Sequence, residues 1–186
     1  MKDRFIQEMR KVDRDGIDTL LDYMDAAGFF KAPCSGSHHL AKDGGLVEHS
    51  LNVLDLARKL NKAWEAEIDE ETLILVTLLH DLGKMGDHGR SYYVEKILKS
   101  GKRSESTPFE TNKELNYIPH EVRSVMIVER FIHLSDDEEQ AILWHNGLYG
   151  AFKYDISSRE TALYMILHFS DMWASRVVET EEKEGE

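Results

Sequence analysis

Residues 70–82 read EETLILVTLLHDL, a stretch that is apolar on nearly every side. A strand is conceivable for its middle, but its length and its lack of alternation between apolar and polar positions favour a buried helix. The run ends in LLHDLGK, residues 78–84, where His80, Asp81 and Lys84 stand among leucines. An ionisable group that is buried without a partner is costly. We therefore predict a central buried helix that ends at a polar site.

The segments around this run are predicted to be helical as well, because their apolar residues recur at steps of three and four. Pro119 would occupy the first turn of one helix. SDDE at 135–138 reads as a capping box that opens a helix. SSRE at 157–160 has similar spacing and is predicted to open the last helix. The predicted helices are 2–13, 17–27, 46–60, 70–82, a short one near YYVEKILK (92–99), 119–132, 135–146 with Gly147 as its stop, and 157–178. We interpret the chain as an all-α, single-domain helical bundle.

Within this one domain, 1–186, we distinguish three parts. Residues 1–37 form N-terminal helices and a loop, and residues 38–178 form a core that carries the candidate site. The tail ETEEKEGE, 179–186, is acidic, and we expect it to be frayed and solvated.

Composition excludes several classes of protein. The chain has 23 Lys and Arg against 35 Asp and Glu, a net charge of −12, which disfavours binding of long nucleic acid. Cys34 is the single cysteine, so neither a disulfide framework nor a thiolate zinc cluster is expected. No apolar stretch is long enough for a membrane span, and the first residues do not resemble a signal peptide. We expect a cytoplasmic protein without a membrane partner.

Histidines and aspartates are spread over the predicted helices in a pattern that suggests a metal site. Five of the predicted helices, 46–60, 70–82, 119–132, 135–146 and 157–178, each contribute one or two potential ligands, as is common for metal sites in helical bundles. The set is His49, His80, Asp81, His120, His145 and Asp171. Neutral imidazole and carboxylate are good ligands for divalent transition metals. Taken singly, a histidine in an apolar helix is more often a core or surface residue than a ligand. The whole set exceeds what one ion with open positions needs and suits two ions that share Asp81.

The order H…HD…H…H…D, with GGLVEHSLNV around His49 and LLHDLGK around His80, resembles the HD-domain phosphohydrolase superfamily over residues 38–178. The segments SHHLAKDGGLVEHS, WHNG and LHFSDMWAS are similar to the HD part of certain bacterial 3′-to-5′ exoribonucleases. Those enzymes also carry an OB domain, for which we expect no room in this chain. Stand-alone HD nucleotide hydrolases are similar too.

The resemblance implies roles for the candidate residues. His49, His80, Asp81 and Asp171 would hold a first metal, and His120 and His145 would hold a second, with Asp81 bridging. Either would be a divalent transition metal, with Mn, Fe, Co, Ni and Zn all suitable. A metal-bound water would attack a phosphoester or phosphoanhydride, with Asp81 positioning that water and Lys84 reaching a substrate phosphate. Lys84 otherwise reads as a surface residue after a helix end.

Other residues have a structural and a functional interpretation side by side. We expect His168 to hydrogen-bond a ligand, with a core histidine and then a direct metal ligand as the alternatives. His38 and His39 could contact substrate or shape their loop. Arg90, Tyr92, Lys96 and Arg103 could contact phosphate or base, or lie in a solvated loop, and Arg176 is a weaker candidate. Trp144 reads as core, and His88 and His133 as surface residues.

Three functions remain open at this point. The first, which we favour, is hydrolysis of a small nucleotide, a mono- or triphosphate. The second is trimming of short RNA or single-stranded DNA from the 3′ end. The third is a non-catalytic HD module that binds a nucleotide or a partner. A homodimer is compatible with each.

Overall fold

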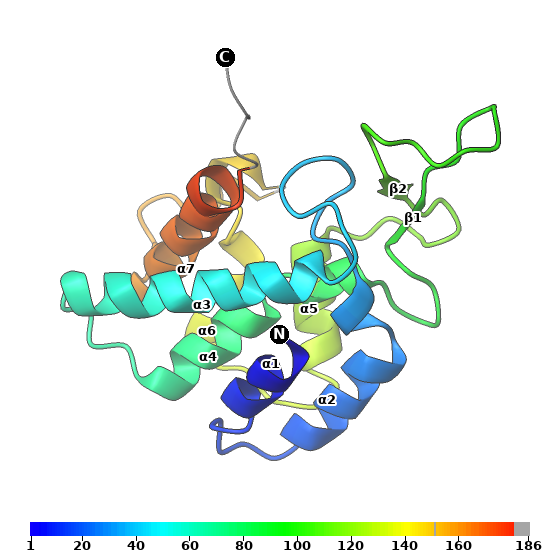
Figure 1. Cartoon of the computed structure of the whole chain (residues 1–186). Coiled ribbons are helices and arrows are strands. Elements are labelled where there is room, and N and C mark those ends of the chain that lie inside the picture. The colour runs from blue at the N-terminus through cyan, green and yellow to red at the C-terminus, as the bar shows by residue number, and fades with distance from the viewer. Residues whose placement is uncertain (151, 181–186) are drawn as a thin grey trace.

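The computed structural model describes residues 1–150 and 152–180. Seven α-helices are the main regular structure of the described chain (Figure 1), and the expectation of an all-α HD-type fold is confirmed. In chain order they are α1 (Lys2–Met9), α2 (Ile17–Ala26), α3 (Gly45–Ala63), α4 (Glu70–Leu79), α5 (His120–Val128), α6 (Asp136–Trp144) and α7 (Ala162–Trp173). Short 3-10 helices cover Phe29–Lys31, Leu82–Met85 and Gly147–Tyr149, and a π-helix, η4, covers Ala174–Val178.

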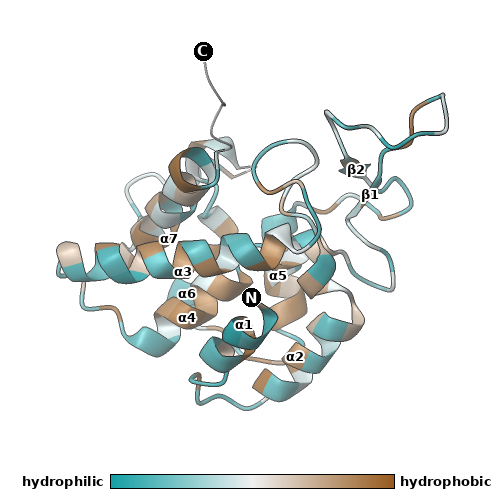
Figure 2. Cartoon of the chain, in the orientation of Figure 1, coloured by the Kyte–Doolittle hydropathy of each residue, from teal (hydrophilic) through white to brown (hydrophobic). Residues whose placement is uncertain are grey.

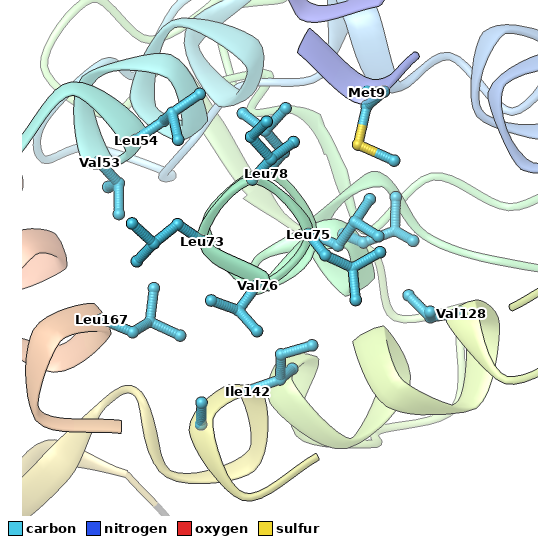
Figure 3. Close-up of a cluster of buried hydrophobic side chains, with 14 of the residues drawn as sticks. Met9, Val53, Leu54, Leu73, Leu75, Val76, Leu78, Val128, Ile142 and Leu167 are labelled. Atoms are coloured by element: carbon cyan, nitrogen blue, oxygen red, sulfur yellow. The ribbon is translucent and has the colours of Figure 1, made fainter. Parts of the chain in front are cut away.

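Helix α4 forms the centre of the hydrophobic core, as its sequence predicts. Every residue from Leu73 to Leu79 is buried. Figure 3 looks down this helix and shows its side chains pointing outward in all directions. They meet Leu54 of α3, Ile142 of α6 and Leu167 of α7, and also Met9 and Val128. The outer helices are amphipathic, with hydrophobic residues turned toward α4 and hydrophilic ones toward solvent (Figure 2).

Helix α4 begins at Asp69, whose side chain accepts a hydrogen bond from the Thr72 amide at 2.8 Å. It ends with His80 as its C-cap, and Asp81 leads directly into the 3-10 helix Leu82–Met85. The polar end of LLHDLGK is therefore where the central helix stops. Among the described helices, none is long and apolar enough to cross a membrane.

The predicted short helix at 92–99 is wrong. Tyr93–Glu95 is a strand, β1, paired antiparallel with β2, Phe109–Thr111, in the register Val94 opposite Glu110. Aromatic and β-branched residues such as Tyr93 and Val94 favour strands when a partner strand is available. The two strands form a hairpin that projects from the bundle (Figure 1).

Several helix starts and ends also differ from prediction. Helix α7 begins after Thr161, whose hydroxyl accepts from the Tyr164 amide at 3.3 Å, and not at SSRE. Ser158 has a φ of +65°, which an α-helix does not accommodate. Pro119 is the N-cap of α5 and not its first residue. Helices α1 and α5 end at Met9 and Val128, four residues before the predicted ends, and α6 ends at Trp144.

Candidate metal centre

The fold brings all six predicted ligands together from five helices. Asp171 lies in α7, and His49 lies in α3. The other four lie at helix ends: His80 caps α4, Asp81 follows it, His120 is the first residue of α5, and His145 caps α6. His49, His80, Asp81 and His145 are at most 1% exposed. The site therefore forms where the central helix stops and the surrounding helices begin or end.

One group of ligand atoms surrounds the Nε2 atom of His49. This atom lies 3.3 Å from Nε2 of His80, 3.1 Å from Oδ1 of Asp171 and 3.6 Å from Oδ2 of Asp81. Nε2 of His80 is itself 3.5 Å from the same Asp81 oxygen. Distances of this size between ligand atoms leave room for one cation in their midst.

A second group surrounds the other oxygen of Asp81. Oδ1 of Asp81 lies 3.2 Å from Nε2 of His120 and 3.4 Å from Nε2 of His145. The two imidazole nitrogens are 3.4 Å apart. The carboxylate of Asp81 thus divides its two oxygens between the two groups.

Each of the four histidines has its Nδ1 atom close to an oxygen atom of the protein. His80 and His145 donate to the backbone carbonyls of Thr77 and Ile142, at 2.8 and 2.7 Å. Nδ1 of His49 faces the Glu179 carboxylate at 2.9 Å, and Nδ1 of His120 faces Glu121 at 3.2 Å. A carbonyl or carboxylate oxygen can only accept, so the hydrogen of a neutral ring sits on Nδ1 and the lone pair on Nε2.

This arrangement fits a bound cation. Lone pairs of Nε2 atoms face one another and the oxygens of Asp81. Among the described residues, Oδ1 of Asp81 is buried and makes no hydrogen bond. Lone pairs in such proximity repel unless a positive charge lies between them, and a buried oxygen without a partner is costly. The residues present are therefore suited to a divalent metal, and groups such as His49, His80 and Asp171 could hold one.

Burial and charge set the pKa values in the site. Burial lowers the pKa of His80 to about 3, so this ring is neutral and able to ligate. Burial would raise the pKa of Asp81, but the Lys84 ammonium and the surrounding imidazoles hold it well below its usual value. Burial would likewise lower the pKa of His145, but Asp81 and Asp171 raise it. The site thus concentrates negative charge that a cation would offset.

Lys84 lies in the 3-10 helix Leu82–Met85, and its Nζ atom is 2.6 Å from Oδ2 of Asp81. Its side chain is 14% exposed. Burial would lower the pKa of Lys84, but Asp81 raises it well above its usual value, so the group is a fixed cation. The predicted proximity of Lys84 to the candidate metal ligands is therefore present.

A cleft of about 160 Å³ opens over the site. Lys84 and the candidate ligands His145 and Asp171 line it. His39, Tyr149 and Arg176 are also among its lining residues, and the Arg176 guanidinium lies over the Tyr149 ring at 4.7 Å. Burial lowers the pKa of His39 to about 4, so His39 is neutral there.

The other predicted substrate residues are placed differently. His38 is exposed, and its amide bonds the Ser35 hydroxyl. Arg90 donates to the Glu114 carbonyl at 2.7 Å, Tyr92 is half-buried beside β1, and Lys96 follows β1 in the hairpin. The residues that line the cleft do not include these four. Their contact with substrate remains a prediction.

His168 supports a ligand through the backbone. Its Nδ1 donates to the His145 carbonyl at 2.7 Å, and its ring stacks on Tyr164. Gly147 permits this, because a Cβ there would lie 2.3 Å from Cε1 of His168. The predicted hydrogen bond to a ligand residue is present, although it reaches the main chain and not the imidazole.

The prediction of a frayed tail is wrong at its first residue. Glu179 has a side chain that is 1% exposed, and besides His49 it accepts a hydrogen bond from Asn52 at 2.9 Å. Residues 181–186 lie outside the described residues. The acid-rich sequence after 178 offers no sign that one glutamate turns inward, so the pattern could not reveal it.

Comparison with known proteins agrees with the geometry. A family model described as HD domain matches residues 46–174, a range that includes all six candidate ligands. Searches of curated proteins and of solved structures found no match. HD domains are generally metal-dependent hydrolases that bind divalent ions. The match covers well over half of the chain, so the chain belongs to the HD domain family.

Proposed function

We propose that this protein hydrolyses a phosphoester or phosphoanhydride bond of a small nucleotide and that its site holds two divalent ions. The observation that carries the proposal is the position of Asp81, one oxygen of which faces His49 and His80 and the other His120 and His145. A shared carboxylate between two ligand groups is typical of dinuclear sites for phosphoryl chemistry. When bound, the ions would supply a nucleophilic water and offset charge on the phosphoryl group.

The protein's own residues favour an anionic substrate. Lys84 is fixed by Asp81 at one of its three N–H donors, and the others can point into the cleft toward a phosphoryl oxygen. Arg176 adds a second cation among the cleft-lining residues. His39 is neutral and can donate a hydrogen bond without adding charge. Together these groups would orient a phosphate toward Asp81.

The size of the cleft supports a small substrate. A volume of about 160 Å³ suits a phosphate with part of the group attached to it. The rest of a nucleotide would extend to the mouth, where Tyr149 is 73% exposed and can stack on a planar ring. The net charge of −12 would oppose a long polyanion.

The test is a hydrolysis screen with protein loaded with Mn²⁺. The substrates are ribo- and deoxyribonucleoside mono- and triphosphates and short labelled RNA and DNA oligomers. We expect turnover of at least one mononucleotide, lost in Asp81→Asn and retained in Asp3→Asn, which removes an exposed carboxylate of α1. Turnover of oligomers alone would contradict the small-nucleotide proposal, and tight nucleotide binding without hydrolysis would contradict an enzymatic role.

A further inference from the structure

The inference concerns Glu179, which the match to the HD domain model does not include. Its carboxylate oxygens lie 3.0 and 2.9 Å from Nδ1 of His49, the ring whose Nε2 faces Asp171 and His80. We propose that Glu179 is a positioning residue that holds His49 as a ligand of the first ion. This rests on the proposed metal centre.

Glu179 is held in place from α3 itself. Asn52 lies three residues after His49 in this helix, so the two side chains share a face. Its amide donates to Oε1 of Glu179 at 2.9 Å, while His49 bonds the same carboxylate. Oε2 is also 3.9 Å from Nε2 of His39, the cleft-lining histidine of the preceding loop. One buried carboxylate therefore joins the segment after α7 to the helix and the loop that shape the site.

The π-helix after α7 explains how Glu179 reaches this position. In a continuous α-helix, eight residues advance by about 800°, so Glu179 would be rotated by roughly 80° from Asp171. The Glu179 amide instead bonds the Ala174 carbonyl, five residues earlier, at 2.9 Å. A π turn advances fewer degrees per residue, and it brings Glu179 back to the side of Asp171. The same segment thus provides a ligand and a group that orients another ligand.

Each ligand group has one histidine supported by a backbone carbonyl and one whose Nδ1 faces a carboxylate. His80 and His145 donate to carbonyls of their own helices, which are neutral. His49 has the Glu179 carboxylate, and His120 has Glu121. A carboxylate on Nδ1 fixes ring orientation and makes Nε2 a more basic ligand, and loss of such a partner typically costs about 10–100-fold in metal affinity. Glu179 should therefore act on the ion at His49, and Glu121 on the ion at His120.

The experiment is calorimetric titration of the full metal-free chain with Mn²⁺. We expect Glu179→Ala to weaken the binding of one of the two ions by about 10–100-fold. The Mn²⁺ affinity of Glu179→Gln should fall between those of Glu179→Ala and wild type, because the glutamine amide oxygen still accepts from Nδ1 of His49 while the charge is lost. Glu121→Gln should weaken the binding of the other ion. Asp55→Asn is the control, since Asp55 is on α3 but pairs with Arg4 at the surface.

Three results would overturn the proposal. The first is wild-type affinity in Glu179→Ala, and the second is equal weakening of both ions, which a general structural role would produce. The third is wild-type Mn²⁺ affinity in Asn52→Ala. This variant removes the second hydrogen bond to Glu179 and serves as the test in case Glu179→Ala does not fold. A wild-type chain that binds no Mn²⁺ would overturn the metal centre together with this inference. In the proton NMR spectrum of the metal-free protein, a downfield signal from Nδ1–H of His49 that is lost in Glu179→Ala would support the positioning role of Glu179.

Discussion

Asp81 shows at the scale of one residue why the site needs positive charge. The side chain is 1% exposed and each oxygen faces two imidazole Nε2 atoms, while Lys84 contacts Oδ2 alone. A buried carboxylate that loses its cationic partner is strongly destabilising, because its desolvation is no longer offset. Lys84 therefore stabilises the metal-free site as well as facing the cleft.

Lys84→Met is expected to lower the free energy of unfolding of the metal-free chain by about 3–5 kcal/mol. Added Mn²⁺ should restore more stability to this variant than to wild type, because the ion replaces the missing charge. Urea unfolding with and without Mn²⁺ measures both values. Lys59→Met, at an exposed position of α3, is the control. An equal loss with and without metal would argue against this role.

Gly147 is a second position where one residue decides local structure. Its φ is +52°, and a Cβ there would lie 2.3 Å from His168. We expect Gly147→Ala to displace His168 from the His145 carbonyl and to cost about 1–3 kcal/mol in addition to backbone strain. The matched control is Gly101→Ala, where φ is +78° but the space is open. Urea unfolding compares the free energies of unfolding of the two variants. Equal losses would show that displacing His168 costs no stability.

Helix starts illustrate the scale of the element. The capping box of α6 is present as predicted, with Ser135 accepting from the Glu138 amide and Glu138 accepting from the Ser135 amide. The SSRE segment has the same spacing but starts no helix. The difference is tertiary. Gln140 of α6 accepts a hydrogen bond from the Thr161 amide and donates one to the Arg159 carbonyl, which fixes the chain just before Thr161.

Thr161→Ala should therefore lower the free energy of unfolding by about 1 kcal/mol, because it removes the side-chain cap of α7. Ser157→Ala should change it little, since Ser157 is exposed and lies before the helix. Urea unfolding of the two variants compares them directly. A larger loss in Ser157→Ala would restore the predicted start at 157.

At the scale of the whole molecule, an ion network joins three helices. Glu8 of α1 accepts from Arg58 of α3 at 2.6 Å and from Lys11 at 2.7 Å, and Arg58 also pairs with Glu70 of α4. The Arg58 hydrogen bond, with help from Lys11 and against burial, lowers the pKa of Glu8 from 4.5 to about 2. The folded chain therefore holds this carboxylate charged where the unfolded chain would protonate it.

The sign of the pH dependence follows from this lowered pKa. The contribution of Glu8 to stability is full above the unfolded pKa of 4.5 and is lost as pH falls toward about 2. We expect Glu8→Gln to be less stable than wild type at pH 7 and to lose less stability between pH 4.5 and pH 2. Urea unfolding across this pH range tests it, with the exposed Asp3→Asn as control. Parallel pH profiles of Glu8→Gln and wild type would contradict the assignment.

The sequence by itself determined the features that depend on neighbours along the chain. The all-round apolar pattern of 70–82 predicted the buried helix α4 and its polar end, and SDDE predicted the capping box of α6. The order of histidines and aspartates indicated a shared metal site, because ligand chemistry is carried by residue type and helical spacing.

Only the tertiary structure decided how distant segments meet. The division of the two Asp81 oxygens depends on where α3, α5 and α6 place their imidazoles. Strand β1 needed a partner, Phe109–Thr111, that lies beyond a loop, and Glu179 turned inward through a π turn to reach His49. Strand pairing and burial of a charge gain their free energy from contacts between residues far apart in the chain, and no local pattern encodes those contacts.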